Sequence, residues 1–236
     1  MRGKTGQAIG LVSVALIGAF GTASPMQAQN TNAQDASSPY PSMAPIEQYR
    51  MNRDAEIALA RTAAPPSISR DAEVLVLGQK NFETAVKGTN GFVCVVGRAF
   101  AGPLSNPEFW SPKNRSPICL NPPAARSLLP YAVKQAGMAL AGASKAQIAD
   151  AIRAAVAKKE LGVPEAGSMC YMMSKEAYLT DQGSHNLAHV MFELPRTGVF
   201  QDDPAFFVSW DPAPIIEFNV PVGQWSDGTS AHKPRP

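Results

Sequence analysis

The sequence is short of the residues and motifs by which most catalytic sites are recognised. It has three cysteines and three histidines among 236 residues. It contains no Cys-x-x-Cys pair, no Gly-x-Ser-x-Gly elbow, no Walker loop and no Gly-x-Gly-x-x-Gly fingerprint. These absences exclude the common thioredoxin-like, hydrolase and nucleotide-binding signatures. The sequence therefore leaves open whether the protein is an enzyme, and it predicts no cofactor.

The chain also lacks an excess of charge of either sign. It has 21 Lys and Arg against 19 Asp and Glu, and residues 1–28 contain Arg2 and Lys4 but no acid, which leaves 19 of each in the remainder. Nucleic acids and anionic lipids select for clustered cations. We therefore expect neither as a partner.

No apolar run is long enough to span a bilayer. The longest, residues 8–20, is shorter than the roughly 20 residues that a membrane helix needs. Because cations precede it and small residues follow it, residues 1–28 are predicted to be a secretory signal peptide. The first cysteine is Cys94, so no thiol is placed for a lipid anchor. We expect a soluble periplasmic or secreted protein.

Composition divides the rest of the chain into three parts. Residues 29–45 are polar and proline-rich, which is typical of a flexible leader. A single domain is predicted over residues 46–227, and residues 228–236 form a flexible tail.

The first half of this domain mixes helix and strand signals. A helix is predicted from Ile46 to the Pro65-Pro66 pair, followed by a buried strand over residues 72–78. Alternating segments on either side of Asn90-Gly91 predict a β-hairpin of residues 82–87 with 92–96.

The second half suggests a central antiparallel helix pair followed by strands. The first helix, residues 124–142, carries Pro130 and is expected to kink or split there. The second begins at a capping box formed by Ser144 and Gln147. Four strand-like segments separated by turn residues follow. Because strands and helices do not alternate, we predict an α+β domain with a largely antiparallel sheet, the helix pair and an N-terminal helix.

His185 and His189 are four residues apart, a spacing that can hold a metal ion on a helix. No glutamate lies between them, and a strand-like run follows. In an extended chain they would stand about 13 Å apart, too far to share an ion. We interpret them as loop and strand-end residues, and the alternatives are that one of them lines a site or that the two form a metal pair.

The three cysteines allow at most one internal disulfide. Cys94 with Cys119 is the favoured pairing, because a short loop joins them. Burial as free thiols is an equally weighted alternative. Cys170 could be a nucleophile only if a histidine approached it.

The loop over residues 99–115 is long and rich in Pro, Asn, Ser and Gly, and it carries Phe109 and Trp110. Long loops are often functional. The leading hypothesis is an exported, non-catalytic domain that uses these two aromatic residues to bind a small ligand, a glycan or an envelope partner. The rival is a metal- or thiol-dependent enzyme centred on His185 and His189, with Cys170 and with a nearby acid such as Asp181 or Asp202.

Overall fold

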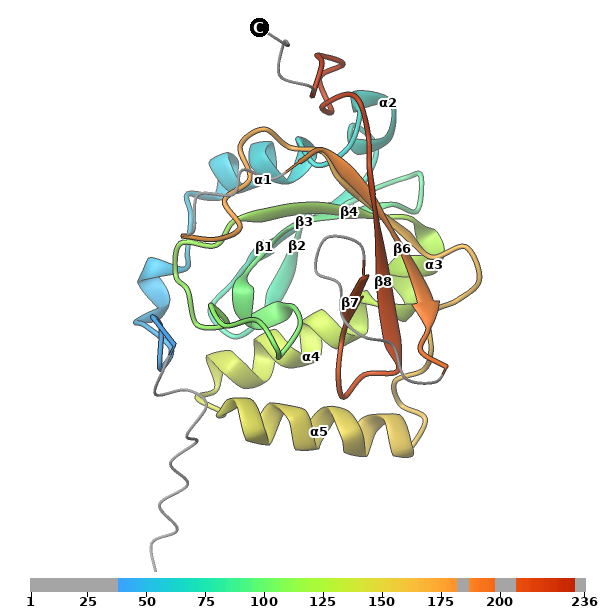
Figure 1. Cartoon of the computed structure of the whole chain (residues 1–236). Helices are drawn as coiled ribbons and strands as arrows, with labels where there is room; N and C mark the ends of the chain where they lie inside the picture. The colour runs from blue at the N-terminus through green and yellow to red at the C-terminus, as the bar shows by residue number, and fades with distance from the viewer. Residues whose placement is uncertain (1–37, 182–186, 198–206, 232–236) are drawn as a thin grey trace, which may run out of the picture. The chain divides into compact units, whose positions relative to one another are not determined.

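The computed structural model describes residues 38–181, 187–197 and 207–231. All of them belong to one compact unit that begins at Ala33, and the preceding unit, Met1–Asn32, lies outside the described residues. The core of the described unit is a mixed eight-stranded sheet in the order β2-β1-β3-β4-β5-β6-β8-β7 (Figure 1). With five α-helices in the described ranges, the unit is of the α+β class.

The strands are short and rich in β-branched and aromatic residues, as strands of a half-buried sheet usually are. In chain order they are β1 (Glu73–Leu77), β2 (Phe82–Val86), β3 (Val93–Gly97), β4 (Ser116–Leu120), β5 (Met169–Met172), β6 (His189–Pro195), β7 (Phe207–Ser209) and β8 (Ile215–Pro221). Strands β1 and β3 are parallel, and the other neighbouring pairs of the described sheet are antiparallel.

The α-helices are α1 (Arg53–Arg61), α2 (Pro66–Ser69), α3 (Pro122–Ser127), α4 (Leu129–Leu140) and α5 (Lys145–Ala157), and two short 3-10 helices are η2 (Ile46–Gln48) and η3 (Ala99–Ala101). Among the residues that the structure describes, none of these helices has both the length and the apolar character that crossing a bilayer requires.

The first long helix begins later than predicted. Its N-cap is Asn52, whose side-chain oxygen accepts hydrogen bonds from the backbone N–H groups of Asp54 and Ala55 at 3.0 and 3.2 Å. An asparagine in this position satisfies helix donors that would otherwise have no partner, so it sets the start of the helix. The predictions for the later helices are confirmed at two points: the chain divides before Pro130, and Ser144 and Gln147 form a capping box.

The predicted hairpin between β2 and β3 is wrong. Strand β2 pairs with β1 in antiparallel fashion, and β1 lies between β2 and β3. The residues around Asn90-Gly91 instead hold the chain to Asp71, whose carbonyl oxygen accepts hydrogen bonds from the N–H groups of Thr89 and Asn90. Strand β1, whose side chains are buried on both faces of the sheet, thus lies between β2 and β3.

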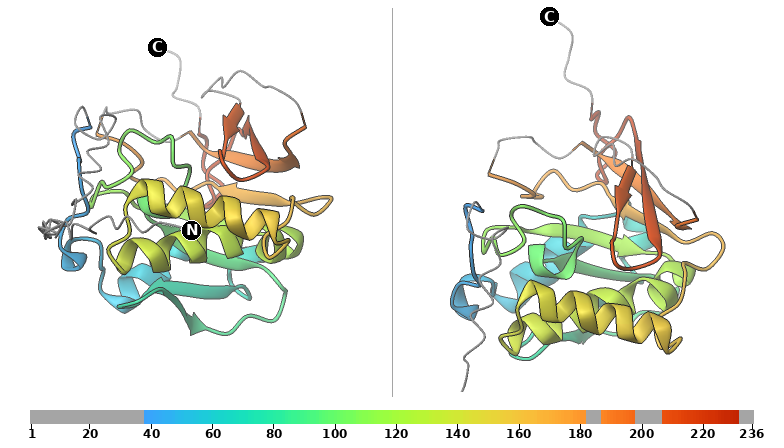
Figure 2. Two further views of the ribbon diagram at one scale, coloured as in Figure 1. Left: turned by 90° about the horizontal axis from the view of Figure 1, so that it is seen from below. Right: turned by 60° about the horizontal axis from the view of Figure 1, so that its bottom comes forward.

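The two faces of the sheet belong to separate cores. In β3, Val93 and Val95 enter the larger core while Cys94 and Val96 enter the smaller one, as the two-residue period of a strand requires. Helix α1 contacts β1, β3 and β4 and covers the smaller core. Helices α4 and α5 lie together against the larger core on the opposite face (Figure 2). The cavity described below opens on this larger-core face.

Candidate functional site

A cavity of about 570 Å³ lies on the larger-core face of the sheet. This volume falls within the usual range of small-molecule sites. Alternate residues of β3 to β8 form one wall, and the start of α4 with η3 and its following loop forms the other. The side chains that line it are mostly aliphatic or sulfur-containing, among them Val95, Ile118, Met172, Met191, Val208, Leu128, Leu129 and Ala132.

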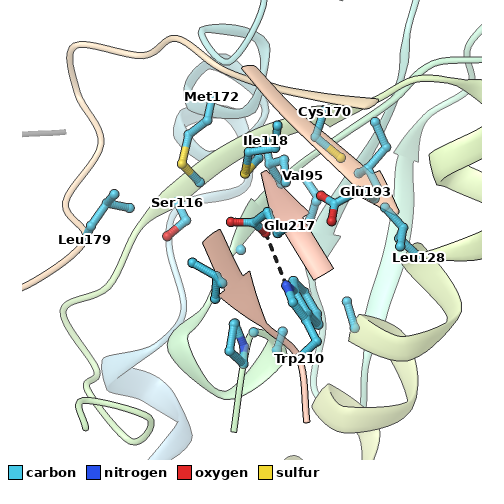
Figure 3. Close-up of a pocket in the computed structure, with 18 of the residues that line it drawn as sticks. Val95, Ser116, Ile118, Leu128, Cys170, Met172, Leu179, Glu193, Trp210 and Glu217 are labelled. Carbon is cyan, nitrogen blue, oxygen red and sulfur yellow. Dashed lines mark hydrogen bonds between the residues drawn. The ribbon is translucent and has the colours of Figure 1, made fainter. Parts of the chain in front are cut away.

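Two acidic residues interrupt this apolar lining. Glu193 of β6 and Glu217 of β8 are direct partners in the antiparallel register, so their side chains leave the same face of the sheet. Glu193 is 3% exposed, and Glu217 is half-buried. Figure 3 shows both carboxyl groups in the cavity, between Cys170 and Trp210. Strand β8 also brings Asn219, two residues further along the same face.

The surroundings of the two carboxyl groups disfavour their charged forms. Burial raises the pKa of Glu217 to about 7, although hydrogen bonds from Trp210 and Asn219 oppose this effect. The Trp210 Nε1–H donates to Glu217 Oε2 at 3.2 Å. Burial, and after it the charge of Glu217, raises the pKa of Glu193 well above its ordinary value. The pair therefore holds protons at a pH at which exposed glutamates are ionised.

Cys170 lies beside this pair and is the free cysteine among the described residues. Its thiol donates a hydrogen bond to Glu193, and burial followed by the charges of Glu193 and Glu217 raises its pKa well above the ordinary value. A nucleophilic cysteine needs a lowered pKa and an electropositive setting. The environment of Cys170 is the reverse of that setting.

Arg98 also lines the cavity, but its charge is matched elsewhere. Its guanidinium contacts Glu56 at 2.8 Å, and both side chains are almost completely buried. Arg98 Nε also donates to the carbonyl oxygen of Tyr49 at 2.8 Å. Burial lowers the pKa of Arg98 to about 10, and the charge of Glu56 opposes this effect. At neutral pH the two therefore form a structural ion pair beneath the cavity.

Phe109 and Trp110, the two residues predicted to bind a ligand or partner, are not at the surface. They are 1% and 5% exposed, and their rings meet edge to face with centroids 4.6 Å apart in the larger core. The carbonyl oxygen of Trp110 accepts a hydrogen bond from the Tyr49 hydroxyl at 2.7 Å. The loop over residues 99–115 is thus tied down by aromatic packing, and these rings are not available to stack on a ligand at the surface.

Of the histidine pair, His189 is the first residue of β6 and lines the cavity. Burial lowers its pKa, and its Nδ1 is 2.6 Å from the carbonyl oxygen of Leu187. His185 and the acid Asp202 lie outside the described residues. That the two histidines do not share a metal ion therefore stays a prediction. Within the described ranges, no three His, Cys, Asp or Glu residues gather in a way that could hold a metal ion.

Asp181, the other candidate acid, belongs to a separate cluster of side chains. Lys113 contacts both of its carboxylate oxygens at 3.1 Å, and the hydroxyl groups of Tyr40 and Tyr178 donate to it. These hydrogen bonds, that of Tyr178 first, lower the pKa of Asp181 to about 2. Asp181 is therefore a charged member of a surface cluster.

The disulfide between Cys94 and Cys119 is present. The two residues are direct partners in β3 and β4, and both face the smaller core, away from the cavity. The disulfide therefore links β3 to β4 on the face opposite the cavity, and it does not line the cavity.

The sequence did not identify Glu193, Glu217 or Trp210 as site residues. The signal it offers is a glutamate within each of two strands, in the segments HVMFELP and IIEFNVP. Both segments are apolar at odd and even positions alike, so alternation does not reveal which face the glutamates occupy.

Comparison with known proteins does not indicate a function for this site. No protein-family model, curated protein or solved structure matches the chain.

Proposed function

We propose that this chain is an exported protein that binds a small, largely apolar molecule without transforming it. The observation that carries the proposal is the cavity of about 570 Å³ with its aliphatic lining. Folded proteins pack their interiors closely, and a void of this size forfeits many contacts unless a ligand fills it. A small ligand is thus favoured over a glycan or an envelope protein.

Two features support export. Residues 1–28 have the order of charged, apolar and small residues that secretory signals have. The Cys94–Cys119 disulfide is typical of proteins that fold in an oxidising compartment. We therefore propose the periplasm or the external medium as the place where the protein acts.

Binding is favoured over catalysis by the chemistry of the lining. The raised pKa of Cys170 keeps it a thiol, and Arg98 is occupied by Glu56. The carboxyl pair is the feature that favours a second candidate, an acid–base enzyme in which one glutamate gives a proton and the other accepts it. Recovery of the bound molecule in a chemically altered form would favour this second candidate.

Filling the cavity tests the binding proposal. Ala132 lines the cavity from α4, whereas Ala154 is exposed on α5. We expect Ala132→Trp to reduce the affinity of the exported protein for the neutral fluorophore N-phenyl-1-naphthylamine at least tenfold. Ala154→Trp adds the same ring to the surface and should leave the affinity unchanged. Fluorescence titration measures both.

Two results would overturn the proposal: no binding by the unmodified protein, or equal binding by the two tryptophan variants. Because Ala132→Trp could also fail through misfolding, Ile118→Phe provides a second obstruction from the β4 wall. Circular dichroism establishes that each variant is folded before it is titrated.

A further inference from the structure

Two buried polar atoms of the cavity have no hydrogen-bond partner in the described ranges, and both are acceptors when Glu193 is ionised. Glu193 Oε2 and Asn219 Oδ1 are buried and receive no hydrogen bond from the residues that the structure describes. A buried acceptor without a donor costs about 1–3 kcal/mol, and more when it is charged. Two such atoms on neighbouring strands of one cavity wall therefore indicate an occupant that brings donors.

Within the described part of the chain, Glu193 and Glu217 also lack a compensating positive charge. Like charges directly opposite in an antiparallel pair destabilise a sheet. Five titratable or charged described residues line the cavity, namely Arg98, Cys170, His189, Glu193 and Glu217. Arg98 is held by Glu56 and by two backbone carbonyl groups. Burial disfavours the charged form of His189. Among the described residues, no free cation faces the two glutamates.

We propose that the cavity binds an organic ammonium ion with an apolar body, whose nitrogen lies between Glu193 and Glu217. The inference rests on the proposed function, because it names the class of ligand that the same cavity takes. A primary ammonium group brings one positive charge and three donors. Glu193 Oε2, Glu217 and Asn219 Oδ1 provide acceptors for them. The aliphatic wall receives the apolar body.

Trp210 also contributes to this proposed ammonium site. Its indole lies next to the carboxyl group of Glu217, to which its Nε1–H donates (Figure 3). The N–H edge of the ring therefore points at the carboxyl group, and its hydrogen bond favours the ionised form that an ammonium ion needs.

Protonation competes with this ligand. A proton and an ammonium ion both neutralise the pair, so the ammonium ion binds to the deprotonated form and releases protons to the solvent. Affinity for the cation should therefore rise with pH toward 8, where Glu217 is largely ionised. Affinity for a neutral ligand of the same shape should not rise in this way.

Three probes of equal chain length test the inference: octylamine, 1-octanol and octanoate, titrated calorimetrically at pH 5.5 and 8. At pH 8 we expect octylamine to bind at least tenfold more tightly than octanol, and octanoate to bind more weakly than octanol. The preference for octylamine should shrink severalfold at pH 5.5. In the double variant Glu193→Gln, Glu217→Gln the two affinities should become about equal, whereas the exposed control Glu176→Gln should keep the preference.

The outcomes separate this inference from the function on which it rests. If octanol binds as tightly as octylamine, or if the double variant keeps the preference, the cavity binds apolar molecules but the ammonium site is wrong. If no probe binds, the proposed function is contradicted as well. Octanol binding by the double variant shows that the variant retains a folded cavity.

Discussion

Glu217→Gln should stabilise the protein at alkaline pH. The substitution keeps the shape of the side chain and an oxygen that can accept the hydrogen bond of Trp210, but it removes the negative charge opposite Glu193. A buried carboxylate costs folding free energy that an amide of the same size does not. A residue that opposes folding in this way is more readily explained by binding than by stability.

The raised pKa of Glu217 determines how much stability the ionised side chain costs. An increase from 4.5 to about 7 corresponds to about 3 kcal/mol of lost stability once the group is ionised in both states. Since the side chain is half-buried, screening by solvent lowers this to about 1–3 kcal/mol. The native state binds the proton more tightly than the unfolded state, so stability falls as pH rises from 4.5 to 7. Below pH 4.5 this cost is absent.

Urea denaturation at pH 4.5 and pH 8 measures the effect as the difference between variant and wild type. Comparison at each pH matters because His189, whose pKa is lowered, contributes the opposite trend in both proteins. We expect a gain of about 1–3 kcal/mol at pH 8 and almost none at pH 4.5. Glu176→Gln removes an exposed carboxylate and should change stability by less than about 0.5 kcal/mol at either pH.

A variant that is no more stable than wild type at pH 8 would refute the reasoning. So would an equal gain at both values of pH, because the benefit would then not arise from ionisation. Either result would mean that the carboxyl pair is solvated or compensated more effectively than its burial indicates.

Two further predictions concern the rest of the fold. Replacing Cys94 and Cys119 together by alanine should lower the free energy of unfolding by about 3.5 kcal/mol, because the bridge closes a loop of 25 residues; urea denaturation measures this, and an unchanged midpoint would contradict it. Arg98→Met should destabilise the protein by about 3–5 kcal/mol by leaving Glu56 buried and unpaired. Adding Glu56→Leu should restore much of this loss, and a double variant no more stable than Arg98→Met would show that the unpaired charge is not the cause.

Local signals in the sequence predicted what depends on a few neighbouring residues. The capping box at Ser144 and the break before Pro130 are properties of single helix turns, and both are present. The partner of β2 is not a local property. A turn at Asn90-Gly91 favours pairing of the segments beside it, but β1 offers a strand buried on both faces, and its pairing prevails.

The site could not be predicted for the same reason. Glu193 and Glu217 are 24 positions apart, and they meet only because β6 and β8 pair in one particular register. A shift of that register by one residue would send one of the two side chains to the opposite face. Phe109 and Trp110, the aromatic residues predicted to bind a ligand, are buried because their loop folds onto the larger core.

Because the two faces of the sheet belong to separate cores, the free cysteine Cys170 is kept apart from the disulfide. In an oxidising compartment, a free thiolate can attack a disulfide and rearrange it. Cys170 is on the strand next to Cys119, but it points into the cavity while the bridge points into the smaller core. The sheet thus isolates the thiol from the bridge, and native pairing persists in the folded protein without any need to eliminate the third cysteine.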